Sequence, residues 1–219
     1  MKSEYVDKFN HDEDAPGYDQ DVLNEAHPIR AGYSELLNWV AAKVEMHKPG
    51  RVLELGSGTG NLTLLLPQVE ALTCVDISTE MQRIAQEKSP ASTHITYVKA
   101  DILEVLDQLD KKFDAVISTY TIHHLTAAEK QLFFAKIESS LAPRGIAVFG
   151  DLMFENQEKK TAYLEQCRRS GQEELAEDIE DEFFWDVELA LDKLQVLGLQ
   201  ASAKQFSELS WGIVAHKHA

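Results

Sequence analysis

The chain has 219 residues, 44% of them hydrophobic, and its formal net charge is −16. This length and composition are typical of a globular chain, so we expect a single domain that spans residues 1–219. The acidic excess disfavours a nucleic-acid partner, because such binding depends on Lys and Arg side chains that neutralise phosphates.

The sequence also disfavours membrane insertion and secretion. No apolar run approaches the roughly 20 residues that cross a bilayer, and Met1–Asn10 lacks the apolar stretch of a signal peptide. Cys74 and Cys167 are expected to be free thiols, and without a close histidine they do not form a zinc site. We therefore expect a cytoplasmic protein with no membrane partner and no bound metal.

Residues 1–48 predict an N-terminal helical cap. His11–Asp21 is polar and contains Pro16-Gly17, which is typical of a loop. Pro28 suits the first turn of a helix, and apolar residues follow at helical spacing as far as His47. The loop carries Tyr18 among many acids, so it is also a candidate lid over a ligand.

Residues 49–154 alternate between strand and helix patterns and are expected to form the ligand-binding core. Strands are predicted at residues 52–55, 71–77, 95–99, 114–118 and 146–149. Helices are predicted at residues 62–66, 79–88, 102–109 and, behind a capping box at 126–129, as far as 141. Apolar strands that alternate with helices predict a parallel α/β sheet covered on both faces.

The last third departs from this alternation. Residues 155–198 are mostly helical in pattern and end at Gly198, so we assign them to a helical insertion. Ala201–Ser207 and Trp211–His216 lie too close together for a parallel crossover, which needs a dozen or more residues. Residues 199–219 are therefore predicted to form an antiparallel hairpin.

The strongest chemical signal is the glycine turn after the first strand, Gly56-Ser57-Gly58-Thr59-Gly60. Glycines let the backbone turn sharply and let a ligand approach without meeting a Cβ atom. The spacing does not fit the Gly-x-Gly-x-x-Gly pattern of nicotinamide binding. No Lys-Ser or Lys-Thr follows, which excludes a Walker phosphate loop.

Two carboxylates end the next two strands. Asp76 lies twenty residues after Gly56, where it is placed to accept hydrogen bonds from both hydroxyls of a ribose. Asp101 ends the third strand and is placed to accept from an adenine amino group, with Ile102 as an apolar face for the ring. The alternative for Asp101 is the N-cap of the following helix.

In chain order these residues resemble the successive motifs of class I S-adenosylmethionine-dependent methyltransferases, over about residues 51–150. The motifs are Glu54-x-Gly56-x-Gly58-x-Gly60, Val75-Asp76-Ile77-Ser78, Ala100-Asp101, residues 113–118 and Leu141-x-Pro143-x-Gly145. The Ser-Thr-Tyr-x-x-His-His-Leu run at 118–125 is similar to that of small bacterial methyltransferases of unassigned substrate. Arg144 departs from the family's Pro-Gly-Gly turn.

The resemblance implies a Rossmann-like methyltransferase fold: a doubly wound, mostly parallel seven-stranded sheet with a C-terminal antiparallel hairpin. It also implies S-adenosyl-L-methionine as the cofactor. The expected cofactor-binding residues are Gly56, Gly58 and Gly60 near the methionine part, Asp76 on the ribose, Asp101 and Ile102 near the adenine, and Tyr18 from the lid.

The acceptor is expected after the fourth strand, beside the candidate catalytic residues Tyr120, His123 and His124. One histidine could act as a general base, Tyr120 could line the acceptor pocket, or all three could simply pack at the sheet edge. A metal on the paired histidines is disfavoured, because neighbouring side chains diverge and no acidic third ligand is near in sequence.

Residues 172–192 contain ten acidic residues and no Lys or Arg. They form either a solvated helix face or a field that favours a cationic acceptor, and one of Phe183, Phe184 and Trp185 could face the acceptor pocket. We expect a methyltransferase acting on a small molecule. The alternatives are a cofactor-binding sensor that transfers no methyl group and an RNA methyltransferase, which the net charge disfavours. The oligomeric state is left open.

Overall fold

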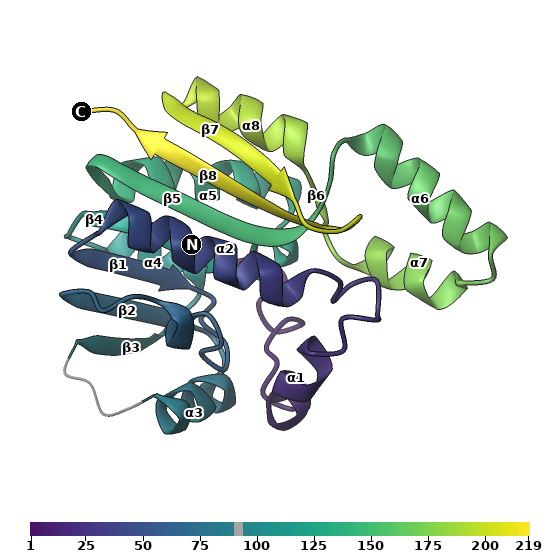
Figure 1. Ribbon diagram of the computed structural model, residues 1–219, viewed down its shortest axis with the longest axis horizontal. Coiled ribbons are helices and arrows are strands. Elements are labelled where there is room, and N and C mark those ends of the chain that lie inside the picture. Colours follow the sequence, from purple (N-terminus) through teal and green to yellow (C-terminus); the bar gives the residue numbers. More distant parts are fainter. Residues whose placement is uncertain (90–93) are drawn as a thin grey trace.

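The centre of the computed structural model, which describes residues 1–89 and 94–219, is a twisted sheet in the order β3-β2-β1-β4-β5-β8-β7 (Figure 1). The strands from β3 to β5 are parallel, and β8 runs antiparallel to both β5 and β7. The doubly wound sheet with a terminal hairpin is therefore confirmed. The strand bounds are β1 Arg51–Leu55, β2 Ala71–Asp76, β3 Ile95–Lys99, β4 Phe113–Thr119, β5 Leu141–Phe154, β7 Leu199–Gln205 and β8 Ser210–Lys217.

Helices cover both faces of this sheet (Figure 1). On one face, α2 (Tyr33–His47) packs its apolar side on the strands. On the other face, α4 (Ile102–Gln108), α5 (Ala127–Ser140) and α8 (Val187–Val196) enclose a second apolar cluster. The central strands are apolar on both faces because both faces are buried. Helix α3 (Thr79–Lys88) has the predicted bounds, and its N-cap is Ser78, whose hydroxyl accepts from the amide of Met81.

Two predictions for the N-terminal region are wrong. The second half of the predicted loop forms helix α1 (Ala15–Val22), because Pro16 falls in its first turn, where a proline removes no helical hydrogen bond. The predicted helix start at Pro28 is five residues too early, because residues 28–32 form turns and α2 begins at Tyr33. Gly32 precedes it with a φ of 80°, a left-handed conformation through which a right-handed helix does not continue.

The C-terminal insertion contains α6 (Gln157–Arg169), α7 (Glu173–Asp181) and α8. Helices α6 and α7 extend beyond the end of the sheet, on the side where α1 also lies (Figure 1). The helical pattern does not hold throughout, because Trp185–Asp186 forms the short strand β6, which pairs with the end of β5. This pairing brings the chain after α7 back to the sheet.

Smaller differences concern local backbone. The predicted helix 62–66 is a short 3-10 helix, η1 (Thr63–Leu65). Strand β5 begins at Leu141, before the predicted turn at residues 143–145. Its pairing with β4 shifts register between Phe113 and Ala115. Arg144 has a φ of 65°. Both cysteines are buried and unpaired. Within the described ranges, every helix falls short of the length and apolar character needed to cross a bilayer.

Candidate active site

A cavity of about 890 Å³ lies beyond the carboxyl ends of β1, β2 and β4. Parallel α/β sheets bind ligands at this edge, where the loops after the strands converge. The cavity also receives side chains from the N-terminal segment and from α7. Gly60 is not among the lining residues. The other nine predicted site residues all line the cavity: Tyr18, Gly56, Gly58, Asp76, Asp101, Ile102, Tyr120, His123 and His124.

The glycine turn is pressed against the loop that follows β4. Gly56 has a φ of 70°, and a Cβ atom added there would overlap the side chain of Thr121. The amides of Gly56 and Ser57 both donate to the carbonyl of Val75, at 2.8 and 3.0 Å. A residue with a side chain at position 56 would therefore separate the ends of β1 and β4.

Asp76 is held at the floor of the cavity. Its Oδ2 accepts from the amide of Gly58 at 2.7 Å and its Oδ1 from the amide of Ser78 at 2.8 Å. Burial raises the pKa of this carboxyl, while the two amide donors act in the opposite direction. Each carboxylate oxygen has a second acceptor site for a ligand hydroxyl.

The cavity wall also fits a polar ligand at Ser57. The Oγ atom of Ser57 is buried and has no hydrogen-bond partner among the described residues, although Ser57 lines the cavity. Buried polar groups are normally hydrogen-bonded, so this atom indicates a ligand contact. Together with Asp76 and the open turn at Gly58, it suits the nucleoside and amino-acid parts of S-adenosylmethionine.

Asp101 is the N-cap of α4, which was the alternative to a ligand role, and it also lines the cavity. Its Oδ1 accepts from the amides of Leu103 and Glu104, at 2.9 and 3.1 Å, and so caps α4. Its Oδ2 accepts from the hydroxyl of Ser3. The N-terminal segment thus reaches the place where an adenine amino group was expected.

Further contacts hold the N-terminal segment over the cavity. Asp12 accepts from the hydroxyl of Ser78 at 2.6 Å and from the amide of Glu80 at 3.1 Å. Asp19 accepts from the hydroxyl of Thr59 at 2.6 Å and pairs with Lys88 at 2.7 Å. These contacts link both the segment before α1 and α1 itself to the glycine turn and to the residues from Ser78 to Lys88.

Tyr120 has its hydroxyl turned toward the C-terminal hairpin. The hydroxyl lies 3.2 Å from Oγ of Ser210, and burial raises the pKa of the phenol above its ordinary value. The ring packs on Tyr33, with the two centroids 5.1 Å apart. With a φ of 48°, Tyr120 occupies a region that is uncommon for non-glycine residues and recurs at functional sites.

His123 is enclosed between two carboxylates that the sequence did not indicate. Its Nδ1 contacts Oδ1 of Asp151, its amide donates to Oδ2 of Asp151 at 3.0 Å, and its Nε2 lies 3.6 Å from Oε2 of Glu182. Burial lowers the pKa of His123, but the charges of Asp151 and Glu182 outweigh it, so that the net shift is upward. Asp151 is fully buried in β5.

Glu182 reaches His123 because two hydrogen bonds fix the chain after α7. The amide of Phe183 donates to the carbonyl of His123 at 3.0 Å. The ammonium of Lys130 donates to the carbonyl of Phe183 at 2.6 Å and to that of Leu125. Burial lowers the pKa of Lys130 to about 7. The segment that carries Glu182 is thereby attached to the loop after β4.

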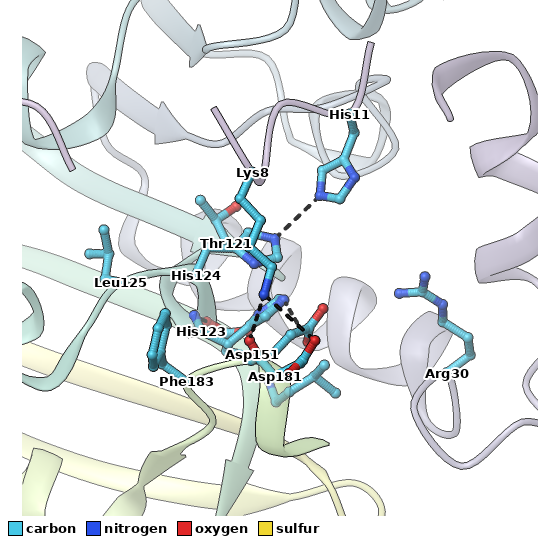
Figure 2. Close-up of polar contacts among 12 residues, drawn as sticks. Lys8, His11, Arg30, Thr121, His123, His124, Leu125, Asp151, Asp181 and Phe183 are labelled. Atoms are coloured by element: carbon cyan, nitrogen blue, oxygen red, sulfur yellow. Dashed lines mark hydrogen bonds and ion pairs between the residues drawn. The ribbon is translucent and has the colours of Figure 1, made fainter. Parts of the chain in front are cut away.

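His124 faces the N-terminal segment. Its ring stacks on Phe9, with centroids 4.1 Å apart, and its Nε2 lies 3.5 Å from Nε2 of His11. Figure 2 shows this approach of His11 from above, with His123 and Asp151 on the other side of His124. Burial lowers the pKa of His124 well below its ordinary value, and the neighbouring histidines add to the effect.

Comparison with known proteins identifies the family. Residues 52–145 match the family described as a methyltransferase domain. An uncharacterized methyltransferase of Oceanobacillus iheyensis is 33% identical over 220 residues, which cover 100% of both chains. This chain belongs to the class I S-adenosylmethionine-dependent methyltransferase family. A second methyltransferase, from Geobacillus kaustophilus, is 32% identical and 99% of each chain is covered.

Solved structures agree with this methyltransferase fold. The DhpI-SAM-HEP complex has a TM-score of 0.68 at 20% identity, and covers 96% of this chain and 95% of that one. Magnesium protoporphyrin IX methyltransferase from Synechocystis with bound SAH also has a TM-score of 0.68, at 16% identity, with 97% and 99% covered. These two likenesses concern the fold, whereas the use of S-adenosylmethionine for methyl transfer follows from membership of the family.

Proposed function

We propose that this methyltransferase acts on a small molecule that binds between the loop after β4, the N-terminal segment and α7. One observation carries the proposal: a single cavity of about 890 Å³ is lined both by Asp76 and Asp101 and by His123, His124 and Glu182. Cavities of roughly 300–1,000 Å³ suit small ligands. This one has room for the cofactor and a compact acceptor side by side.

Different residues of the cavity are assigned to different parts of the cofactor. We assign Asp76 to the ribose, Asp101 and Ile102 to the adenine, and the glycine turn to the methionine part. When bound, the cofactor supplies a methyl group that its sulfonium already activates. The protein then has to hold the acceptor close to that methyl group, in line with the S–CH₃ bond, and to exclude water.

We also assign the N-terminal segment a role as a lid, together with Tyr18. Ser3, Asp12 and Asp19 contact the ends of β2 and β3 and the glycine turn, so an ordered segment encloses whatever lies beneath it. Lids of this kind commit a substrate and keep water from the reacting atoms. A closed site of this size suits a small acceptor better than a polymer.

The charge supports the same choice of acceptor. The chain carries 37 acidic and 21 basic residues. Because nucleic acids bind mainly through Lys and Arg contacts to phosphates, this balance disfavours RNA or DNA as the acceptor. One protein of similar fold is named for a small compound, the magnesium protoporphyrin IX methyltransferase of Synechocystis.

The test is a search for the methylated product. The protein is incubated with S-adenosylmethionine carrying a labelled methyl group and with fractions of a bacterial extract, separated into small molecules, RNA and protein. We expect label only in small-molecule products heavier by one CH₂ group in mass spectrometry. Label confined to the RNA or protein fractions would contradict the proposal.

A further inference from the structure

We propose that His123, His124 and Glu182 bind a divalent transition-metal ion in the acceptor part of the cavity. Each of the three offers one ligand atom, and these atoms all lie within 4.8 Å of one another. From the sequence, a metal is disfavoured because neighbouring side chains diverge and because no acidic third ligand is near in sequence. The fold removes both objections, because the two imidazoles and Glu182 present ligand atoms close together and α7 ends where Glu182 can reach His123.

The separation between His123 and Glu182 suits a bridging ion. Nε2 of His123 and Oε2 of Glu182 are 3.6 Å apart, which is longer than an ordinary hydrogen bond. Two ligands bound to one ion at about 2.0–2.2 Å, at roughly tetrahedral angles, lie about 3.3–3.6 Å from each other. The two side chains are therefore already near the spacing of a shared ion.

The surroundings of His123 are those of a metal ligand. Its Nδ1 contacts the buried carboxylate of Asp151, which orients the ring and leaves Nε2 for an ion. Such carboxylate–histidine–metal arrangements are general among protein metal sites. Lys130 and the amide of Phe183 fix the segment that carries Glu182, so the third ligand is held in place as well.

His124 supplies a second, independent indication. Its Nδ1 is buried and has no hydrogen-bond partner among the described residues. A buried polar nitrogen without a partner is rare in native structures. Imidazole nitrogens are also the commonest protein ligands of transition-metal ions.

Two imidazoles and one carboxylate select the ion and leave positions open for the acceptor. This ligand set suits Zn²⁺, Fe²⁺ and other first-row ions rather than Mg²⁺, which prefers oxygen ligands. The bound ion would hold an acceptor hydroxyl or thiol and lower its pKa. This role rests on the proposed function, whereas the metal site itself does not.

The chemistry balances without a further reactant. The acceptor loses its proton to water on binding to the ion. Its oxygen or sulfur then forms a bond to the methyl carbon, while the S–CH₃ bond breaks and its electron pair stays on the cofactor's sulfur. The products are the methylated acceptor, S-adenosylhomocysteine and one proton.

The test measures metal binding directly on the full chain after treatment with a chelator. Calorimetry with Zn²⁺ should show one site per chain, and Co²⁺ should give the visible absorption of a nitrogen- and oxygen-ligated ion. Glu182→Gln and His124→Ala should each weaken Zn²⁺ binding at least about tenfold, and Mg²⁺ should not bind. Glu182 is partly exposed, so its variant tests the site without disturbing the core.

His47→Ala is the matched control. His47 lies at the end of α2 and is not among the residues that line the cavity, so its variant tests a histidine outside the site. We expect the control to keep the zinc affinity of the parent protein. Unchanged affinity in both Glu182→Gln and His124→Ala, or a loss confined to His47→Ala, would overturn the proposed site.

The two proposals fail in different ways. Zinc binding that depends on Glu182 but is accompanied by methylation of RNA alone would uphold the metal site and overturn the small-molecule acceptor. Methylation of a small molecule at an unchanged rate in Glu182→Gln, with no zinc bound to the parent protein, would uphold the acceptor and overturn the metal site.

Discussion

The amide of Gly58 donates to Oδ2 of Asp76 at 2.7 Å, so the glycine turn and the end of β2 form one rigid corner of the cavity. Asp76 serves this corner as an acceptor and, in our proposal, serves the cofactor's ribose as well. The two roles make Asp76 the residue whose loss most directly tests cofactor binding.

Asp76→Ala should weaken binding of S-adenosylmethionine and S-adenosylhomocysteine by about 1–3 kcal/mol, the scale of a buried acceptor that is lost. Titration calorimetry measures this, and thermal unfolding shows whether the variant is folded. Asp110→Asn, at an exposed aspartate, serves as the control and should bind as the parent does. Equal affinity in Asp76→Ala would remove Asp76 from the site.

Alanine substitutions at two positions of the glycine turn should lower the free energy of unfolding by different amounts. Gly58→Ala meets no atom within 4 Å, so it should cost only the strain of a left-handed alanine, about 1–2 kcal/mol of unfolding free energy. Gly56→Ala has the same strain and also overlaps Thr121, which should add about 1–3 kcal/mol. Urea unfolding of both variants measures the difference. Equal losses would show that Thr121 moves aside freely.

The lid predicts a change in hydrogen exchange. Amides in residues 3–22 should exchange more slowly when S-adenosylhomocysteine binds, because ligand and lid stabilise each other by closing together. Asp12→Asn should reduce this protection, since Asp12 accepts from Ser78 and Glu80. The exposed Asp7→Asn is the control. Protection confined to the glycine turn and to the ends of β2 and β3 would contradict a lid.

Glu54 predicts a pH dependence of stability. It is buried at the start of the glycine motif, accepts from Thr63 at 2.7 Å, and burial raises its pKa from 4.5 to about 7. Between pH 4.5 and about 7, the Glu54 carboxyl is therefore mostly protonated in the folded protein and mostly ionised in the unfolded chain. The contribution of Glu54 to the free energy of unfolding is fully present below pH 4.5 and is lost as the pH rises to about 7. The total loss is about 3 kcal/mol.

Glu54→Gln removes this titration and keeps a side chain of similar shape. Between about pH 5 and about pH 8, the unfolding free energy of the parent should fall relative to that of Glu54→Gln by about 2–3 kcal/mol. Urea unfolding at the two pH values measures the difference. Parallel pH profiles for the two proteins would show that Glu54 is ionised in the folded state.

The features that the sequence predicted correctly depend on neighbours along the chain. The glycine turn follows β1, Asp76 is the last residue of β2, Asp101 comes two residues after β3, and these strands are parallel. Their convergence at one edge of the sheet is therefore a consequence of chain order and strand direction. The errors at α1 and α2 arose where a single proline or glycine decided the backbone conformation.

The part of the site around His123 depended on tertiary structure. Asp151 reaches His123 because β5 lies beside β4, and Glu182 reaches it because β6 and Lys130 return the chain after α7 to the sheet. Chain order alone shows Asp151 as a polar residue in an apolar run and Glu182 as one of ten acids. Local patterns determined which residues end or follow β1, β2 and β3 at the edge of the cavity, and long-range packing determined which charges face the paired histidines, because only packing brings distant side chains within bonding distance.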